Sequence, residues 1–187
     1  MTASPENTAA GAASGRTVLG LFVVTQIVYL VMILITLPHL RELSGGMDPF
    51  DMMPGGYDVD YAHRFLAAIG AAGRSFYLTR QIPLDLIYPG LFAISFALIW
   101  RWLLAKATNR PGRLAAVMFL PLLAGLADYG ENACIIAMAI KFPDLPDLLV
   151  AVASTLTIIK SAAVMLYFFA LTGLLAVLGR QKFKARG

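Results

Sequence analysis

Four long apolar runs dominate the chain, and polar segments separate them. The runs lie at about 17–38, 78–104, 114–141 and 148–178. Each reaches the ~20 residues that an α-helix needs to cross a hydrocarbon layer ~30 Å thick. Backbone hydrogen bonds in lipid must be satisfied within the protein, which makes helices the structure that such runs predict. The expected fold class is all-α, a four-transmembrane-helix bundle over residues 16–180.

The longest polar connection separates the first and second runs. Its first part, 44–57, is rich in Gly, Pro, Asp and Met, which favours irregular structure. From Asp58 to Gly70 apolar positions recur at helical spacing, and Asp58 can cap the first turn. This pattern predicts a short amphipathic helix at the membrane surface, within the first outer loop. So long a connection in so small a protein is typical of a functional loop or lid.

Polar tails flank the four runs. Residues 1–15 lack the apolar content that offsets the entropy of ordering, so we expect a disordered tail. Residues 181–187 form a short basic tail. The first run ends in Leu-Pro-His-Leu-Arg rather than at a small-residue cleavage site, which predicts an uncleaved first helix.

The composition makes the bilayer an expected partner, and it argues against nucleic acid, an internal disulfide and a multi-cysteine metal site. The 187 residues are 59% hydrophobic and 14% charged, with a mean hydropathy of +0.74. The net charge of +4 comes from basic clusters beside the apolar runs, so nucleic acid is not an expected partner. The single cysteine, Cys134, excludes an internal disulfide and a multi-cysteine metal site. We expect no metal and no cofactor.

The basic residues at the ends of the runs predict an orientation. Seven acidic residues dilute the five basic residues on one side, which are Arg41, Arg64, Arg74, Arg80 and Lys141. The other side has nine, which are Arg16, Arg101, Lys106, Arg110, Arg113, Arg180, Lys182, Lys184 and Arg186. Short basic segments stay in the cytoplasm, so both termini are expected there.

Charged residues inside the apolar runs are the main candidates for function, because such groups are costly in hydrocarbon. Asp128, Glu131 and Asn132 have i, i+3, i+4 spacing, which places them on one face of a helix. With a helical rise of ~1.5 Å per residue from the inner edge, Asp128, Asp85 and Lys160 lie roughly 22, 24 and 30 Å deep. This common level predicts one polar cluster that opens outward beneath the long connection.

The charges of this cluster suggest acid/base chemistry. Neighbouring carboxylates repel each other, and one is pushed toward its protonated form unless a cation neutralises it. Lys160 is the candidate cation, which leaves the remaining carboxyl groups as candidate proton donors or acceptors. The candidate catalytic residues are Asp128, Glu131 and Asp85. The candidate binding residues are Asn132, Lys160, Tyr88, Tyr129, Arg74 and His63.

The same residues also have purely structural interpretations. Asp128 and Glu131 with Lys160 would form an interhelical lock without chemistry. Lys160 alone would extend its ammonium group to the membrane surface. Asp85 would be a surface residue that caps a helix beginning near Pro83. The sequence leaves these alternatives open.

An ordered set of motifs runs along the chain, namely Tyr57-Asp58, Gly73-Arg74 with Tyr77, Pro83-Leu-Asp85 with Tyr88-Pro89, Asp128-x-x-Glu131-Asn132 and Lys160. This set resembles that of small four-helix bacterial membrane proteins, whose location would be the inner (plasma) membrane. This resemblance implies no enzymatic activity for the chain. In size and helix count the chain is also similar to the emopamil-binding and sigma-2-receptor group. Bundles of that group hold acidic residues in a lipid-facing pocket, and one branch isomerises a sterol double bond; the similarity is one of architecture.

Three functions follow from these observations. The leading hypothesis is an intramembrane acidic pocket that binds or transforms a lipid-like or isoprenoid molecule by acid/base chemistry. As an enzyme it would be of isomerase, cyclase or hydrolase type, since two carboxylates suit proton transfer better than redox chemistry. The second is a proton- or ion-coupled carrier, which four spans could form only as a homo-oligomer. The third is a structural or assembly protein whose charges lock helices.

Overall fold

The computed structural model describes residues 14–185, and every regular element within them is a helix. Four helical segments are each long and apolar enough to cross a membrane, namely Gly15–Leu43, Gly70–Ala107, Gly112–Lys141 and Asp147–Lys184. The chain is therefore an integral membrane protein built as an all-α four-helix bundle, as the sequence predicts. The tail expected at residues 1–15 lies outside the described residues, except for Ser14 and Gly15. The last two residues of the expected basic tail also lie outside them.

The first segment consists of α1 (Gly15–Val31), the π-helical turn η1 (Met32–Thr36) and α2 (Leu37–Leu43). The Ser14 hydroxyl caps it by accepting a hydrogen bond from the Thr17 N–H at 3.2 Å. The helix passes through Pro38 and ends five residues later than expected. In η1 the Leu37 N–H bonds the Met32 carbonyl, five residues back. This wider turn shifts the hydrogen-bond register just before a proline, which has no N–H to donate.

The second segment also contains a π-helical turn followed closely by a proline. It consists of α4 (Gly70–Phe76), the π-helical turn η3 (Tyr77–Gln81) and α5 (Ile82–Ala107), and Pro83 is the second residue of α5. The two π turns contact each other, and the Thr36 hydroxyl donates to Gln81 Oε1 at 2.5 Å. The segment begins eight residues before the expected start at 78. Asp85 therefore lies well inside the helix and is only 2% exposed, so its interpretation as a surface cap is wrong.

The connection between these two segments folds back onto the bundle. It contains the short 3₁₀ helix η2 (Phe50–Met52) and α3 (Val59–Ala68), the amphipathic helix that the sequence predicts. Asp58 caps α3 by accepting from the Tyr61 N–H at 2.7 Å. The Phe50 ring is fully buried and packs edge-on against Phe65 of α3, with 4.9 Å between ring centroids. These contacts hold the connection against the helices.

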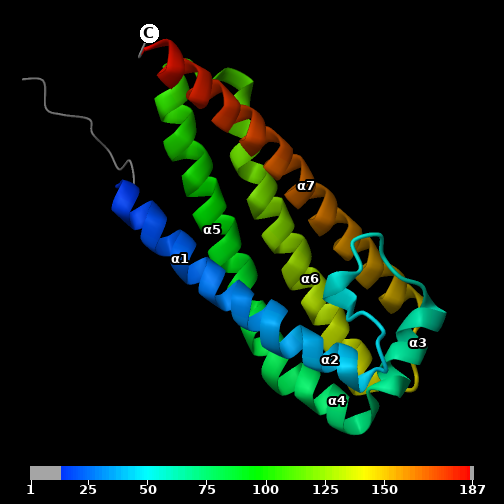
Figure 1. Cartoon of the computed structure of the whole chain (residues 1–187). Coiled ribbons are helices and arrows are strands. Elements are labelled where there is room, and N and C mark those ends of the chain that lie inside the picture. The colour runs from blue at the N-terminus through cyan, green and yellow to red at the C-terminus, as the bar shows by residue number, and fades with distance from the viewer. Residues whose placement is uncertain (1–13, 186–187) are drawn as a thin grey trace, which may run out of the picture.

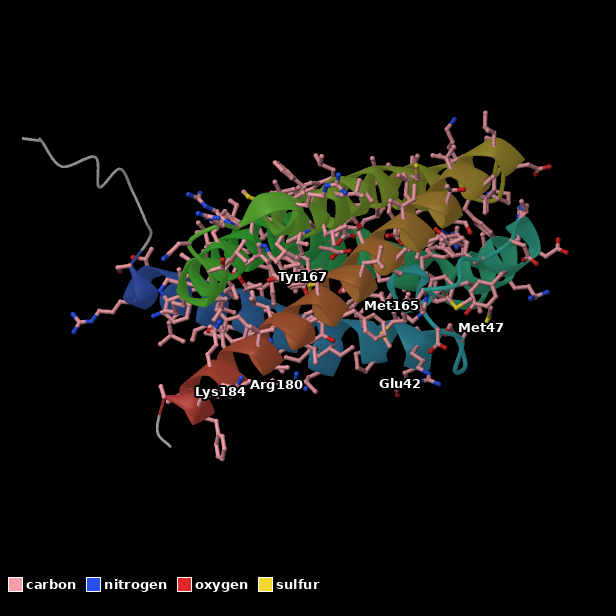
Figure 2. All side chains as sticks on the ribbon, turned by 90° about the horizontal axis from the view of Figure 1, so that it is seen from above. Glu42, Met47, Met165, Tyr167, Arg180 and Lys184 are labelled. Carbon is pink, nitrogen blue, oxygen red and sulfur yellow. The ribbon has the colours of Figure 1, made fainter. Side chains whose placement is uncertain are left out.

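The third segment is η4 (Gly112–Met118) followed by α6 (Phe119–Lys141), and the fourth is α7 (Asp147–Lys184). The residues expected as the start of a basic tail instead continue α7 to Lys184. In the bundle α6 packs against α5 and α7, and α1 packs along α5 (Figure 1). We call the end that carries the 44–58 connection the loop end, and the opposite end the tail end. Figure 2 shows Glu42 and Met47 toward the loop end and Arg180 and Lys184 at the tail end.

Gly125 allows α6 to approach α5 closely. A Cβ atom at this position would lie 2.9 Å from the Pro89 carbonyl oxygen and 3.1 Å from the Cβ of Ala93. Small residues at helix contacts of membrane proteins let the backbones come together, which is the role that this position has here.

We expect Gly125→Ala to lower the free energy of unfolding by about 1–3 kcal/mol, because the added methyl group overpacks the α5–α6 contact. Gly173→Ala is the matched control, since a Cβ at Gly173 meets nothing within 4 Å. Thermal unfolding of both variants in the same detergent micelles measures the difference. Equal midpoints would contradict the close contact.

Candidate functional site

Lys160 of α7 joins two carboxylates of α6 inside the bundle. Its Nζ lies 3.1 Å from Asp128 Oδ1 and 2.5 Å from Glu131 Oε2. The side chains of Lys160, Asp128 and Glu131 are 14%, 8% and 0% exposed, so the ammonium group is held within the protein rather than at the membrane surface. Three of the residues that the sequence singles out are thus brought together as one ion-paired group, which we call the charged triad.

Thr157 provides a further hydrogen bond to the triad. It lies one helical turn before Lys160 on α7, and its hydroxyl donates to Glu131 Oε1 at 2.7 Å. Glu131 therefore accepts from a lysine and a threonine of the same helix. Buried carboxylates need such partners, because an unpaired charge away from water is costly.

Asn132 has a structural partner on α5. Its Nδ2 donates to the backbone carbonyl of Asp85 at 2.9 Å. In an α-helix that carbonyl would accept from the N–H four residues later, but the residue there is Pro89, which has none. The side chain of Asn132 supplies the missing donor and fixes the register of α6 against α5.

The side chain of Asp85 faces the connection at the loop end. It lies beside the carboxylate of Asp51, which belongs to η2. Asp51 Oδ2 accepts from the Tyr77 hydroxyl at 2.5 Å. Asp51 Oδ1 and Asp85 Oδ2 are buried, and the two carboxyl groups are hydrogen-bonded to each other, which requires a shared proton. A pair of acids therefore forms where the connection meets α5.

Tyr57 brings a second group from the connection to the polar cluster. Its backbone N–H donates to Ser154 Oγ of α7 at 2.8 Å. Burial raises the pKa of the Tyr57 hydroxyl, and the nearby negative charge of Glu131 raises it further. The phenol is therefore neutral across the physiological pH range and is available as a hydrogen-bond donor.

A cavity of about 1050 Å³ runs along the bundle from the tail end to the polar cluster. Gly15 and Leu37 both line it, so it extends over roughly 33 Å of the first segment at ~1.5 Å per residue. Most of its wall is apolar, with residues such as Val18, Phe22, Phe92, Phe96, Val164 and Leu171. Among the described residues, its charged side chains are Asp51, Asp85, Asp128 and Lys160, and Asp51 and Met52 of η2 line its loop end.

Not all of the predicted site residues reach this cavity. Tyr88 lines it, with its ring 5.7 Å from that of Tyr29 between centroids. Glu131 and Asn132 lie behind its wall, because they are fully buried and contact α7 and α5. Tyr129, on the same helix, is 38% exposed and does not line the cavity.

Arg74 and His63 also lie away from the cavity. The Arg74 Nη1 donates to the Leu66 carbonyl at 2.8 Å, and its guanidinium lies 4.5 Å from the centre of the Phe142 ring. The His63 ring lies 6.1 Å from the same phenylalanine. Both side chains thus pack α3 and α4 against the turn that follows α6, rather than at the mouth of the site.

Asp51 is the site residue that sequence reasoning missed. It lies in the Gly- and Pro-rich part of the connection, where periodicity gives no information. A signal was present in its neighbours, because Pro49-Phe50 and Met52-Met53 place this acid in an apolar setting. Among the described residues, no group of three or more His, Cys, Asp or Glu side chains is arranged to hold a metal ion.

No protein-family profile, curated protein or solved structure matches the chain.

We expect Lys160→Met to lower the free energy of unfolding by about 3–5 kcal/mol, because it leaves two buried carboxylates without their cation. Adding Glu131→Gln should recover part of this loss, since one of the unpaired charges is then removed. Lys141→Met is the control, because Lys141 is exposed at the loop end. Thermal unfolding of these variants, of Glu131→Gln alone and of the wild type measures the coupling, and additive effects of Lys160→Met and Glu131→Gln would show that the pair is not coupled.

Proposed function

We propose that the protein binds a long lipid-like or isoprenoid molecule in the cavity and acts on it by acid/base chemistry at the polar cluster. The observation that carries this proposal is the shape and lining of the cavity, which is apolar over most of its length and charged at one end. An amphiphile has the same distribution. Its chain would lie along α1 and α5, and its head group would lie against Asp85, Asp128 and Lys160.

The geometry suggests a division of roles. Asp128 and Asp85 face the cavity, so they are the groups that would exchange a proton with the bound molecule. Glu131 lies behind the wall and holds the Lys160 ammonium, which in turn orients Asp128. Glu131 is therefore proposed as a positioning residue, whereas the sequence suggested a catalytic one. Asp51 and Met52 of η2 line the loop end, next to the groups that would react.

We also propose that the tail end faces the cytoplasm of a bacterial cell and that the loop end faces outward. The basic residues of the tail end lie in short segments at the helix ends, the distribution found on the cytoplasmic side. The cavity and its acidic end would then open toward the outer half of the membrane.

Single-cysteine labelling checks this orientation. In a Cys134→Ala background we expect Asp60→Cys, on α3, to react with a membrane-impermeant maleimide added to intact cells. Lys182→Cys, near the end of α7, should react only after the membrane is permeabilised. The reverse pattern would invert the proposed topology.

Filling the cavity should prevent binding. Ser161 lines the cavity next to Lys160, so we expect Ser161→Phe to reduce co-purified lipid-like molecules at least about tenfold through loss of space for the chain. Thr155→Phe is the matched control, because Thr155 is exposed on the same helix. Mass spectrometry of organic extracts from equal amounts of the purified proteins measures the difference. Equal recovery from the two variants would contradict binding in the cavity.

Turnover separates an enzyme from a binding protein. The co-purified molecule, returned to wild-type protein in nanodiscs, should change in mass or in chromatographic retention, and Asp128→Asn should leave it unchanged. A molecule that binds the wild type but is never converted would remove the acid/base step. If nothing binds and Asp128→Asn only destabilises the fold, the triad is an interhelical lock.

A further inference from the structure

We propose that the cavity selects an amphiphile whose head group is uncharged and carries hydroxyl groups, and that Gln26 and Tyr88 bind these hydroxyls. The inference rests on the proposed function, since it names the class of molecule that the same cavity would take. It uses neutral side chains that belong neither to the charged triad nor to the pair of acids.

The first observation is a set of neutral polar side chains without partners. Four such side chains from three helices line the cavity, namely Gln26, Tyr29, Tyr88 and Ser161. Within residues 14–185 none of the four side chains donates or accepts a hydrogen bond, although other polar side chains of the same helices do. The Thr157 hydroxyl, for example, also reaches the Ala153 carbonyl, one turn back on α7, at 3.1 Å.

The second observation is that these side chains lie at the level of the charged groups. Ser161 directly follows Lys160 on α7, and Tyr88 lies one turn after Asp85 on α5. Tyr29 of α1 packs against Tyr88, with 5.7 Å between ring centroids. The polar end of the cavity therefore has neutral hydrogen-bonding groups beside its charged ones.

Gln26 brings the same kind of group from the first helix. It lies one turn before Tyr29, and its neighbour Thr25 has its hydroxyl 3.4 Å from the Leu91 carbonyl of α5. Leu91 is itself one turn after Tyr88, so Gln26 is about one turn from the level of the two tyrosines. An amide in the middle of an apolar helix costs free energy when it has no partner, and a ligand that supplies one would remove that cost.

The third observation is that the charges at this end are already paired. Lys160 is shared between Asp128 and Glu131, and the carboxyl groups of Asp51 and Asp85 are hydrogen-bonded to each other. A charged head group would be buried beside charges that have partners, which is costly. A hydroxyl both donates and accepts, as the amide and the phenol do, so a hydroxylated neutral head group matches the side chains that are left.

Four matched amphiphiles test the head group: monomyristoylglycerol, methyl myristate, myristoylcholine and myristoyl lysophosphatidic acid. All carry the same acyl chain in the same ester linkage. The first is neutral with free hydroxyls, the second is neutral without them, the third is cationic and the fourth is anionic.

Affinities are measured by titration calorimetry with the full-length protein in phosphatidylcholine nanodiscs. They are expressed as mole fractions in the bilayer, after subtraction of the heats of empty nanodiscs. We expect monomyristoylglycerol to bind at least about tenfold more tightly than each of the other three, the factor that two hydrogen bonds of typical net strength supply.

Gln26→Leu and Tyr88→Phe should each reduce the preference for monomyristoylglycerol over methyl myristate about fivefold, because each removes hydrogen-bonding atoms with little change in volume. Gln181→Leu and Tyr129→Phe are the matched controls, since both residues are exposed and neither lines the cavity. The controls should keep the wild-type preference.

Thermal unfolding separates a binding role of Gln26 from a structural one. Gln26→Leu should keep or raise the midpoint of the wild type, because the wild-type amide has no partner within the described residues. A lower midpoint would make Gln26 a helix contact and overturn its role in binding, and Tyr88→Phe would then test the hydroxyl site by itself.

The outcomes separate this inference from the proposed function. If methyl myristate or a charged amphiphile binds as tightly as monomyristoylglycerol, or if both variants keep the preference, the hydroxyl site is wrong. The proposed function survives that result when Ser161→Phe still abolishes binding of methyl myristate. If none of the four amphiphiles binds the wild type, the proposed function fails as well.

Discussion

The ion pairs of Lys160 with Asp128 and Glu131 are the constraint on which the rest of the structure depends. Charges inside hydrocarbon are tolerated only when they meet partners, and each partner here comes from the neighbouring helix. The pairs fix the depth and rotation of α6 relative to α7. A shift of either helix by one turn would leave a charge unpaired, so this contact allows a single arrangement of the two helices.

The contact between α5 and α6 is fixed by a proline. Pro89 frees the carbonyl of Asp85, Asn132 supplies its donor, and Gly125 provides the space for the two backbones to meet. This local arrangement turns the Asp85 side chain toward the cavity and the connection. The two contacts of α6 therefore bring Asp85 of α5 and Asp128 of α6 to the wall of the same cavity.

Much of this architecture follows from the sequence alone. Hydropathy located the four spans, and the spacing of apolar residues located the amphipathic helix. The depth estimate from the helical rise put Asp128 and Lys160 at a common level, and the two side chains do pair. The ends of the helices were missed, because the π turns that carry the chain past Pro38 and into Pro83 depend on contacts between segments. Arg74 and His63 were expected at the site, yet both pack near Phe142, a partner that periodicity does not indicate.

The position of the cavity between α1 and α7 has a consequence for how a molecule reaches it. Both helices line the cavity, but α1 packs against α5 rather than against α7. The proposed amphiphile, already dissolved in the bilayer, would therefore enter sideways by lateral diffusion, and its tail would not meet water. Occupancy would then depend on the mole fraction of that molecule among the surrounding lipids, and poor aqueous solubility would be no barrier.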